Sequence, residues 1–188
     1  MPLDTQTDPA VTMTLEALAD TVIPGEKRWP GDRAIAGVDT GPGAVAAGAL
    51  EVLYLPATGL VAGLNDLARM LNEHAVAYLA EQGLEPDESV PAFVGLPFEH
   101  RTKLILRLTA PGHPEKDGWV GLVLFSNMAY DSAPHLHTAE ALAAGHPGLT
   151  AMGFAKPGAD GLWHFDEYSY GRPLARLHPD TTPSGSPA

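Results

Sequence analysis

The segment from Trp119 to Tyr130 constrains the fold more than any other part of the chain. It is apolar on nearly every side, with only Ser126 and Asn127 as polar side chains. A helix that is apolar all round is normally buried among other helices. The uninterrupted apolar run ends at Phe125 and is far too short to span a bilayer. We therefore expect a central helix, capped by Asp117 and running from Gly118 to about Tyr130.

Four other segments carry apolar residues at helical spacing between proline and glycine breaks: residues 12–23, 44–55, 60–82 and 97–108. Thr12 or Thr14 is suited to cap the first, and Pro24 ends it. Gly83 is suited to end the third, and Pro97 to open the fourth. No run of alternating polar and apolar residues indicates a strand.

These segments predict a mainly α protein, a single-domain bundle of five or more helices over residues 12–178. Residues 138–144 add a short helical piece, and the chain from Gly145 on is an irregular third rich in glycine, proline and aromatic residues. Residues 1–11 and 179–188 are expected to be a disordered lead and tail. The stretches 26–43 and 85–96 are predicted loops, and a loop as long as 26–43 is often functional or interfacial.

Composition excludes several classes of function. The 188 residues include 11 basic and 23 acidic side chains, a net charge of −12, which disfavours nucleic acid and anionic membrane surfaces as partners. The absence of cysteine excludes disulfides, thiolate metal sites and cysteine nucleophiles. The first residues lack the basic and apolar regions of an export signal, so we expect a cytoplasmic protein.

Histidines after the apolar helix form one candidate metal site. His135 and His137 are followed by Glu140 and His146, and imidazole with carboxylate suits zinc, iron or copper. The spacing matches none of the compact helical metal motifs. A solvated loop that contains histidines is the alternative, and we assign no metal.

Polar residues at the end of the same helix form a second candidate. Tyr130 and Asp131 are placed to transfer protons or donate hydrogen bonds at a pocket floor, or simply to finish the helix with Asn127 and Ser132. A triad of Ser132, His135 and Asp131 is a further arrangement, although no Gly-x-Ser-x-Gly elbow surrounds the serine.

Aromatic residues crowd the segment from Trp163 to Arg172. Such a segment is typical of a partner-binding surface, with a pocket wall and an arm folded over the protein's own helices as alternatives. We expect contacts with a protein partner through these side chains: Trp163, Phe165, Tyr168, Tyr170 and Arg172.

No glycine-rich phosphate loop follows a strand anywhere in the sequence. The chain is therefore expected to bind no dinucleotide or other cofactor of its own. If it serves redox chemistry, the flavin belongs to another polypeptide.

The order of several short motifs over most of residues 13–160 resembles the small third subunit of the gluconate 2-dehydrogenase type. The motifs are an opening helix that ends in Ile23-Pro24, the step Pro42-Gly-Ala44, a helix that carries Arg101, the apolar helix with its Tyr130 turn, and Gly153-Phe-Ala-Lys-Pro-Gly158. That family accompanies flavin-dependent dehydrogenases of the glucose-methanol-choline class, and often carries a twin-arginine signal that this sequence lacks.

The resemblance implies a non-catalytic accessory subunit that aids assembly or stability of a flavoprotein, with FAD bound by the partner. Self-association is the other interaction we expect. The alternative is a small cofactor-free or metal-assisted enzyme of bacterial secondary metabolism that uses Tyr130, Asp131, His135 and His137. An enzyme needs these side chains to converge on one concavity, whereas a subunit needs an exposed binding surface.

Overall fold

The computed structural model describes residues 8–156, 158–161 and 180, and within these residues it is mainly α-helical and contains no strand. This confirms the predicted fold class. The helices are α1 (Pro9–Val22), α2 (Ala49–Leu53), the 3-10 helices η1 (Pro56–Thr58) and η2 (Val61–Gly63), α3 (Leu64–Gln82), α4 (Ala92–Gly95), α5 (Phe98–Leu108), α6 (Lys116–Asp131), α7 (Thr138–Ala143) and α8 (Pro147–Ala151).

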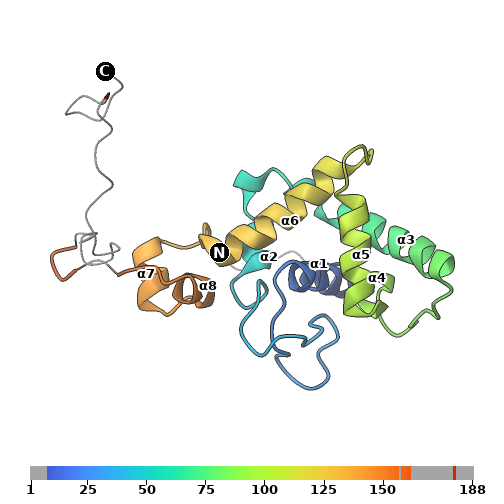
Figure 1. Cartoon of the computed structure of the whole chain (residues 1–188), viewed down its shortest axis with the longest axis horizontal. Coiled ribbons are helices and arrows are strands. Elements are labelled where there is room, and N and C mark those ends of the chain that lie inside the picture. Colours follow the sequence, from blue (N-terminus) through green and yellow to red (C-terminus); the bar gives the residue numbers. More distant parts are fainter. Residues whose placement is uncertain (1–7, 157, 162–179, 181–188) are drawn as a thin grey trace. The chain divides into compact units, whose positions relative to one another are not determined.

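The chain divides into two units, Met1–Phe154 and Ala155–Ala188. All the helices belong to the first unit (Figure 1). In the second, the described residues include a turn in which the N–H of Gly161 donates to the carbonyl of Gly158 at 2.9 Å.

The core of the first unit surrounds α1, which packs against α2, α3, α4, α5 and α6. Its fully buried side chains include Leu15 and Leu18, which meet Leu71 of α3, Leu104 of α5 and Trp119 of α6 in one cluster. Each buried leucine contributes about 1.5–3 kcal/mol. Helix α1 is therefore the centre of the bundle.

Helix α1 begins at Pro9, earlier than the predicted start at Thr12, so the end of the expected disordered lead is helical. Asp8 is the cap, and its carboxylate accepts a 2.9 Å hydrogen bond from the N–H of Ala10. Proline at the first helical position has the φ that a helix needs and no N–H to leave unpaired. Thr14 lies inside the helix and donates to the carbonyl of Ala10 instead.

The predicted helix over 44–55 is shorter in the structure, because only Ala49–Leu53 is α-helical. Gly48, at φ 89°, interrupts it. A Cβ at Gly48 would lie 2.4 Å from Nε2 of His135, so this glycine also allows a close approach by a distant segment. Two short helices, α4 and α8, were not predicted. They bury Phe93 and Leu149, and such short helices depend on packing rather than on local periodicity.

Helix α6 begins at Lys116, with Glu115 at the cap position, so Asp117 lies in the first turn rather than capping it. The predicted central helix packs against α1, α2, α5 and α8, but one of its faces is exposed. Trp119 and Leu122 are buried, but Val120 and Leu124 are exposed. No helix in residues 8–156 has both the length and the apolar character needed to cross a bilayer.

Candidate functional site

The polar residues at the end of α6 serve the helix end locally. Asp131 accepts a 2.8 Å hydrogen bond from the side-chain amide of Asn127, and Ser132 donates to the carbonyl of Met128 at 3.0 Å. Tyr130 is partly buried. These hydrogen bonds fit the helix-finishing alternative, and neither joins Ser132 or Asp131 to His135 as a triad would require.

His135 and His146 lie side by side, with ring centroids 6.1 Å apart. His146 is a structural side chain, because its Nδ1 accepts from the N–H of Leu149 at 3.3 Å and its Nε2 donates to the carbonyl of Ala47 at 3.0 Å. Nδ1 of His135 is buried without a hydrogen-bond partner among the described residues. Burial lowers the pKa of His135, so its uncharged form is favoured.

The candidate set of His135, His137, Glu140 and His146 does not gather as metal ligands, and His137 and Glu140 are exposed. In the described part of the chain, one group of three potential ligands does gather: His74, His113 and Glu115. The spacing of residues along the chain does not indicate this group, because His74 is distant in sequence from His113 and Glu115. The sequence feature that could have indicated the group is His113-Pro-Glu115, two potential ligands just before α6.

The predicted partner-binding residues, Trp163, Phe165, Tyr168, Tyr170 and Arg172, lie outside the described residues. Their role stays a prediction.

The predicted loop over residues 26–43 is present, and its two ends are closed against each other at the end of α1 (Figure 1). The N–H of Glu26 donates to the carbonyl of Gly41 at 2.8 Å, and the N–H of Ala44 donates to that of Ile23 at 2.9 Å. A Cβ at Gly25 would lie 2.5 Å from the nitrogen of Gly43. Glycine is needed here because the two backbones cross at a distance that admits no side chain.

Asp20, near the end of α1, holds this loop from inside. Its carboxylate is buried and accepts two hydrogen bonds, from the N–H of Gly25 at 3.0 Å and from the N–H of Ala36 at 2.8 Å. Burial raises the pKa of Asp20 despite these bonds and the nearby charge of Arg101. One side chain therefore joins the start of the loop to its middle.

Arg101 of α5 holds the same loop from the other side and is only 4% exposed. It donates to the carbonyl of Ala34 at 2.8 Å and of Arg33 at 3.3 Å, both in the loop. It also donates to the carbonyls of Val94, within α4, and of Leu96, the residue that follows α4. Burial lowers its pKa. The resemblance implied an arginine at this position, and its role in the structure is to bind backbone carbonyls.

The loop presents Trp29, which is 54% exposed, on a tight turn. The N–H of Asp32 closes the turn on the carbonyl of Trp29 at 3.0 Å, and Pro30 occupies the second position, where its fixed φ is favoured. The guanidinium of Arg28 lies over the tryptophan ring, 4.8 Å from its centroid. Arg28 also pairs with Glu16 of α1 and with Asp32, at 2.6 and 2.7 Å, so the turn is fixed to α1.

Charged groups under the turn are fully engaged with one another. The pKa of Arg28 is raised by hydrogen bonds to Glu16 and Asp32. Burial by itself would raise the pKa of Asp32, but the hydrogen bonds from Arg28 and from the N–H of Ile35 outweigh it and the pKa is lowered. With its pKa lowered, the Asp32 carboxylate stays ionised and paired with Arg28 near neutral pH, which suits it to structure rather than to proton transfer.

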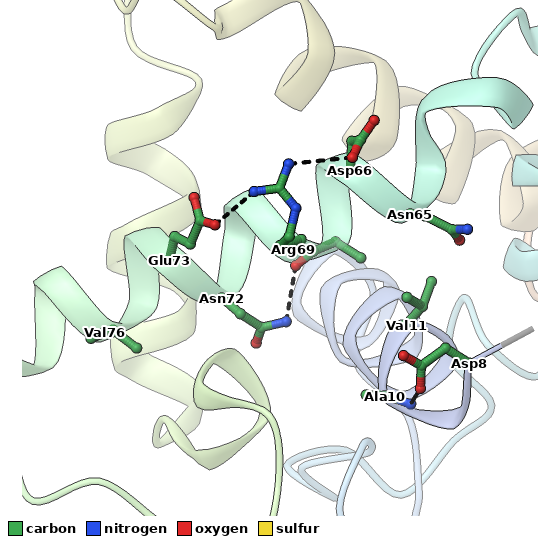
Figure 2. Close-up of a pocket in the computed structure, with 10 residues that line it drawn as sticks. Asp8, Ala10, Val11, Asn65, Asp66, Arg69, Asn72, Glu73 and Val76 are labelled. Carbon is green, nitrogen blue, oxygen red and sulfur yellow. Dashed lines mark hydrogen bonds and ion pairs between the residues drawn. The ribbon is translucent and has the colours of Figure 1, made fainter.

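Two open grooves border the first half of α1. One, of about 420 Å³, lies between α1 and the loop, with Trp29, Met13 and Glu16 in its lining. The other, of about 510 Å³, lies between α1 and α3 (Figure 2).

Several polar side chains of the groove between α1 and α3 are paired with one another or with nearby groups. Figure 2 shows Arg69 between Asp66 and Glu73, its partners at 3.3 and 2.7 Å. Asn72 donates to the hydroxyl of Thr14 at 3.0 Å and accepts from the N–H of Phe93 at 3.0 Å. This groove therefore offers a concave surface of apolar and paired polar side chains.

No curated protein and no solved structure matches this chain. A family model does match residues 9–188, and the chain belongs to that family, which is described as a family of unknown function, DUF5987.

Proposed function

We propose that the protein is a small non-catalytic accessory subunit of a flavin-dependent dehydrogenase or oxidase of the glucose-methanol-choline class, and that the 26–43 loop is a docking surface for this partner. The observation that carries the proposal is Trp29, an exposed tryptophan on a loop that buried groups hold rigid. The order of sequence motifs supports the choice of partner. FAD belongs to the partner, and both proteins act in the cytoplasm.

Physical reasoning favours Trp29 as a binding residue. Tryptophan and arginine are over-represented among the residues that dominate binding energy, and Arg28 lies directly over the Trp29 ring. Because the loop is closed at its base and held by Asp20 and Arg101, little conformational entropy is lost when a partner covers it. The adjacent groove of about 420 Å³ can receive a side chain from the partner.

The alternative, an enzyme that uses Tyr130, Asp131, His135 and His137, has less support. Asp131 is engaged at the helix end by Asn127, and His137 is exposed. The grooves beside α1 are lined by other residues.

Co-expression tests the proposal. The partner is the glucose-methanol-choline flavoprotein whose gene lies nearest to that of this chain, produced with and without it. We expect more soluble, flavin-loaded and active flavoprotein when the chain is present. A flavoprotein that is equally soluble, loaded and active alone would show that the accessory role is wrong.

A pair of variants tests the surface. Trp29→Ala is expected to weaken association by about 2 kcal/mol, roughly 30-fold, because it removes an aromatic anchor. Leu106→Ala is the matched control, since Leu106 is an apolar side chain that is 66% exposed and belongs to α5 rather than to the loop. If the complex forms but both variants bind as tightly as the parent, the 26–43 loop is not the docking surface. The segment from Trp163 to Arg172 is then the next candidate surface to test.

A further inference from the structure

A cluster of imidazole and carboxylate groups lies where α3 meets the start of α6. His74 is in the middle of α3, His113 is in the turn after α5, and Glu115 is the residue just before α6. One potential ligand atom from each lies within 4.8 Å of the others. We propose that His74, His113 and Glu115 bind a divalent transition-metal ion, with zinc as the expected ion.

The chemistry of the three side chains fits this ion. Two histidines and one glutamate form a ligand set that proteins use for zinc at sites with an open coordination position. Tetrahedral zinc, with bonds of about 2.0–2.1 Å, places its ligand atoms about 3.3 Å apart. That spacing lies within the range found here, from 2.8 Å between His74 and Glu115 to at most 4.8 Å.

The surroundings hold the ligands in place before any ion binds. Pro114 stiffens the backbone between His113 and Glu115. The indole N–H of Trp119, which is fully buried, donates to the Glu115 carboxylate at 3.3 Å. The ring of His74 packs edge-on against Trp119 and His113, with centroids 5.7 and 5.8 Å away. Outer contacts of this kind orient metal ligands and strengthen binding.

A metal ion can reach the three side chains, and the hydrogen bond that competes for one of its ligand atoms is weak. The side chains of His74 and Glu115 are 33% and 36% exposed, so an ion can enter and water can complete its coordination. The N–H of Glu115 donates to Nδ1 of His113 at 3.2 Å, a long bond that is readily given up if the ion takes this nitrogen.

The site goes beyond the proposed function, because it shares no residue with the 26–43 loop and needs no partner. Metal binding can therefore succeed or fail independently of the flavoprotein experiments.

Calorimetric titration of the full chain tests the site. The protein carries no histidine tag, is freed of metal with EDTA and is titrated with zinc chloride. We expect one zinc ion per chain, with affinity at least tenfold weaker in His74→Gln and in His113→Gln. His137→Gln, which changes an exposed histidine outside the cluster, is expected to bind as the parent does. No saturable binding, or parental affinity in His74→Gln, would overturn the proposal.

A measurement on the unaltered chain covers the case in which a variant fails to fold. Cobalt(II) replaces zinc, and NMR follows the ring signals of the histidines. We expect the signals of His74 and His113 to broaden first and that of His137 to broaden last. The reverse order would assign the ion to the histidines after α6 and overturn the site.

Discussion

Replacing Arg101 by alanine is expected to lower the free energy of unfolding by about 3–5 kcal/mol, because it leaves buried backbone carbonyls without their donor. Arg101 donates to the carbonyls of Leu96, Ala34, Arg33 and Val94. A hydrogen bond from a charged donor contributes about 1.5–3 kcal/mol, so the sum over these four bonds would exceed the expected loss. The cost of burying the guanidinium offsets part of it, and the lowered pKa of Arg101 reflects that cost.

Urea unfolding followed by circular dichroism measures this effect. Arg107→Ala is the matched control, because Arg107 lies on the same helix and makes an exposed ion pair with Glu81, so we expect little loss of stability. Arg101→Lys keeps the charge but has three donors for four carbonyls, so it is expected to fall between the two alanine variants. If Arg101→Ala and Arg107→Ala lose the same free energy, the reasoning that Arg101 holds the loop is refuted.

Two further predictions concern stability. Gly148→Ala would place a Cβ 1.9 Å from a carbonyl oxygen at the end of α6, so we expect the free energy of unfolding in urea to fall by at least about 2 kcal/mol. The control is Gly63→Ala, whose Cβ meets open space and should change the free energy of unfolding by less than about 0.5 kcal/mol. Equal losses in the two variants would contradict this reasoning. The pKa of Asp87 is lowered to about 2 by hydrogen bonds from Ser89 and Arg33, so its ionised form stabilises the fold above pH ~4, and this contribution is lost as pH falls toward 2. NMR titration of the Asp87 carboxyl should show a midpoint near pH 2 in the parent protein and a higher midpoint in Ser89→Ala. An unchanged midpoint in the variant would show that the Ser89 hydrogen bonds do not lower the pKa of Asp87.

The longer helices could be predicted from the sequence because each buries one periodic face. Helices α1, α3, α5 and α6 lie close to their predicted ranges, and α3 ends at the predicted Gly83. The shortening of α2 could not be predicted, because Gly48 interrupts it where His135, far along the chain, packs against the backbone. Helix α8 was not predicted for a related reason, because its position depends on close packing against α6, which spacing along the chain does not reveal.

The candidate surface was predicted only in outline. The glycine-rich and charged stretch over 26–43 indicated a long loop, and the structure has that loop. The groups that hold it were not predicted, because Asp20 and Arg101 reach it from two helices. Spacing along the chain carries no information about such contacts. The same holds for His74, which meets His113 and Glu115 only through the packing of α3 against the start of α6.

Association with the flavoprotein, measured on purified proteins by size-exclusion chromatography with light scattering, tests the accessory role most directly. The account predicts one species with the summed mass of the flavoprotein and this chain, which Trp29→Ala weakens and Leu106→Ala leaves intact. Separate elution of the two proteins at every concentration tested, or a complex of this chain only with itself, would contradict it.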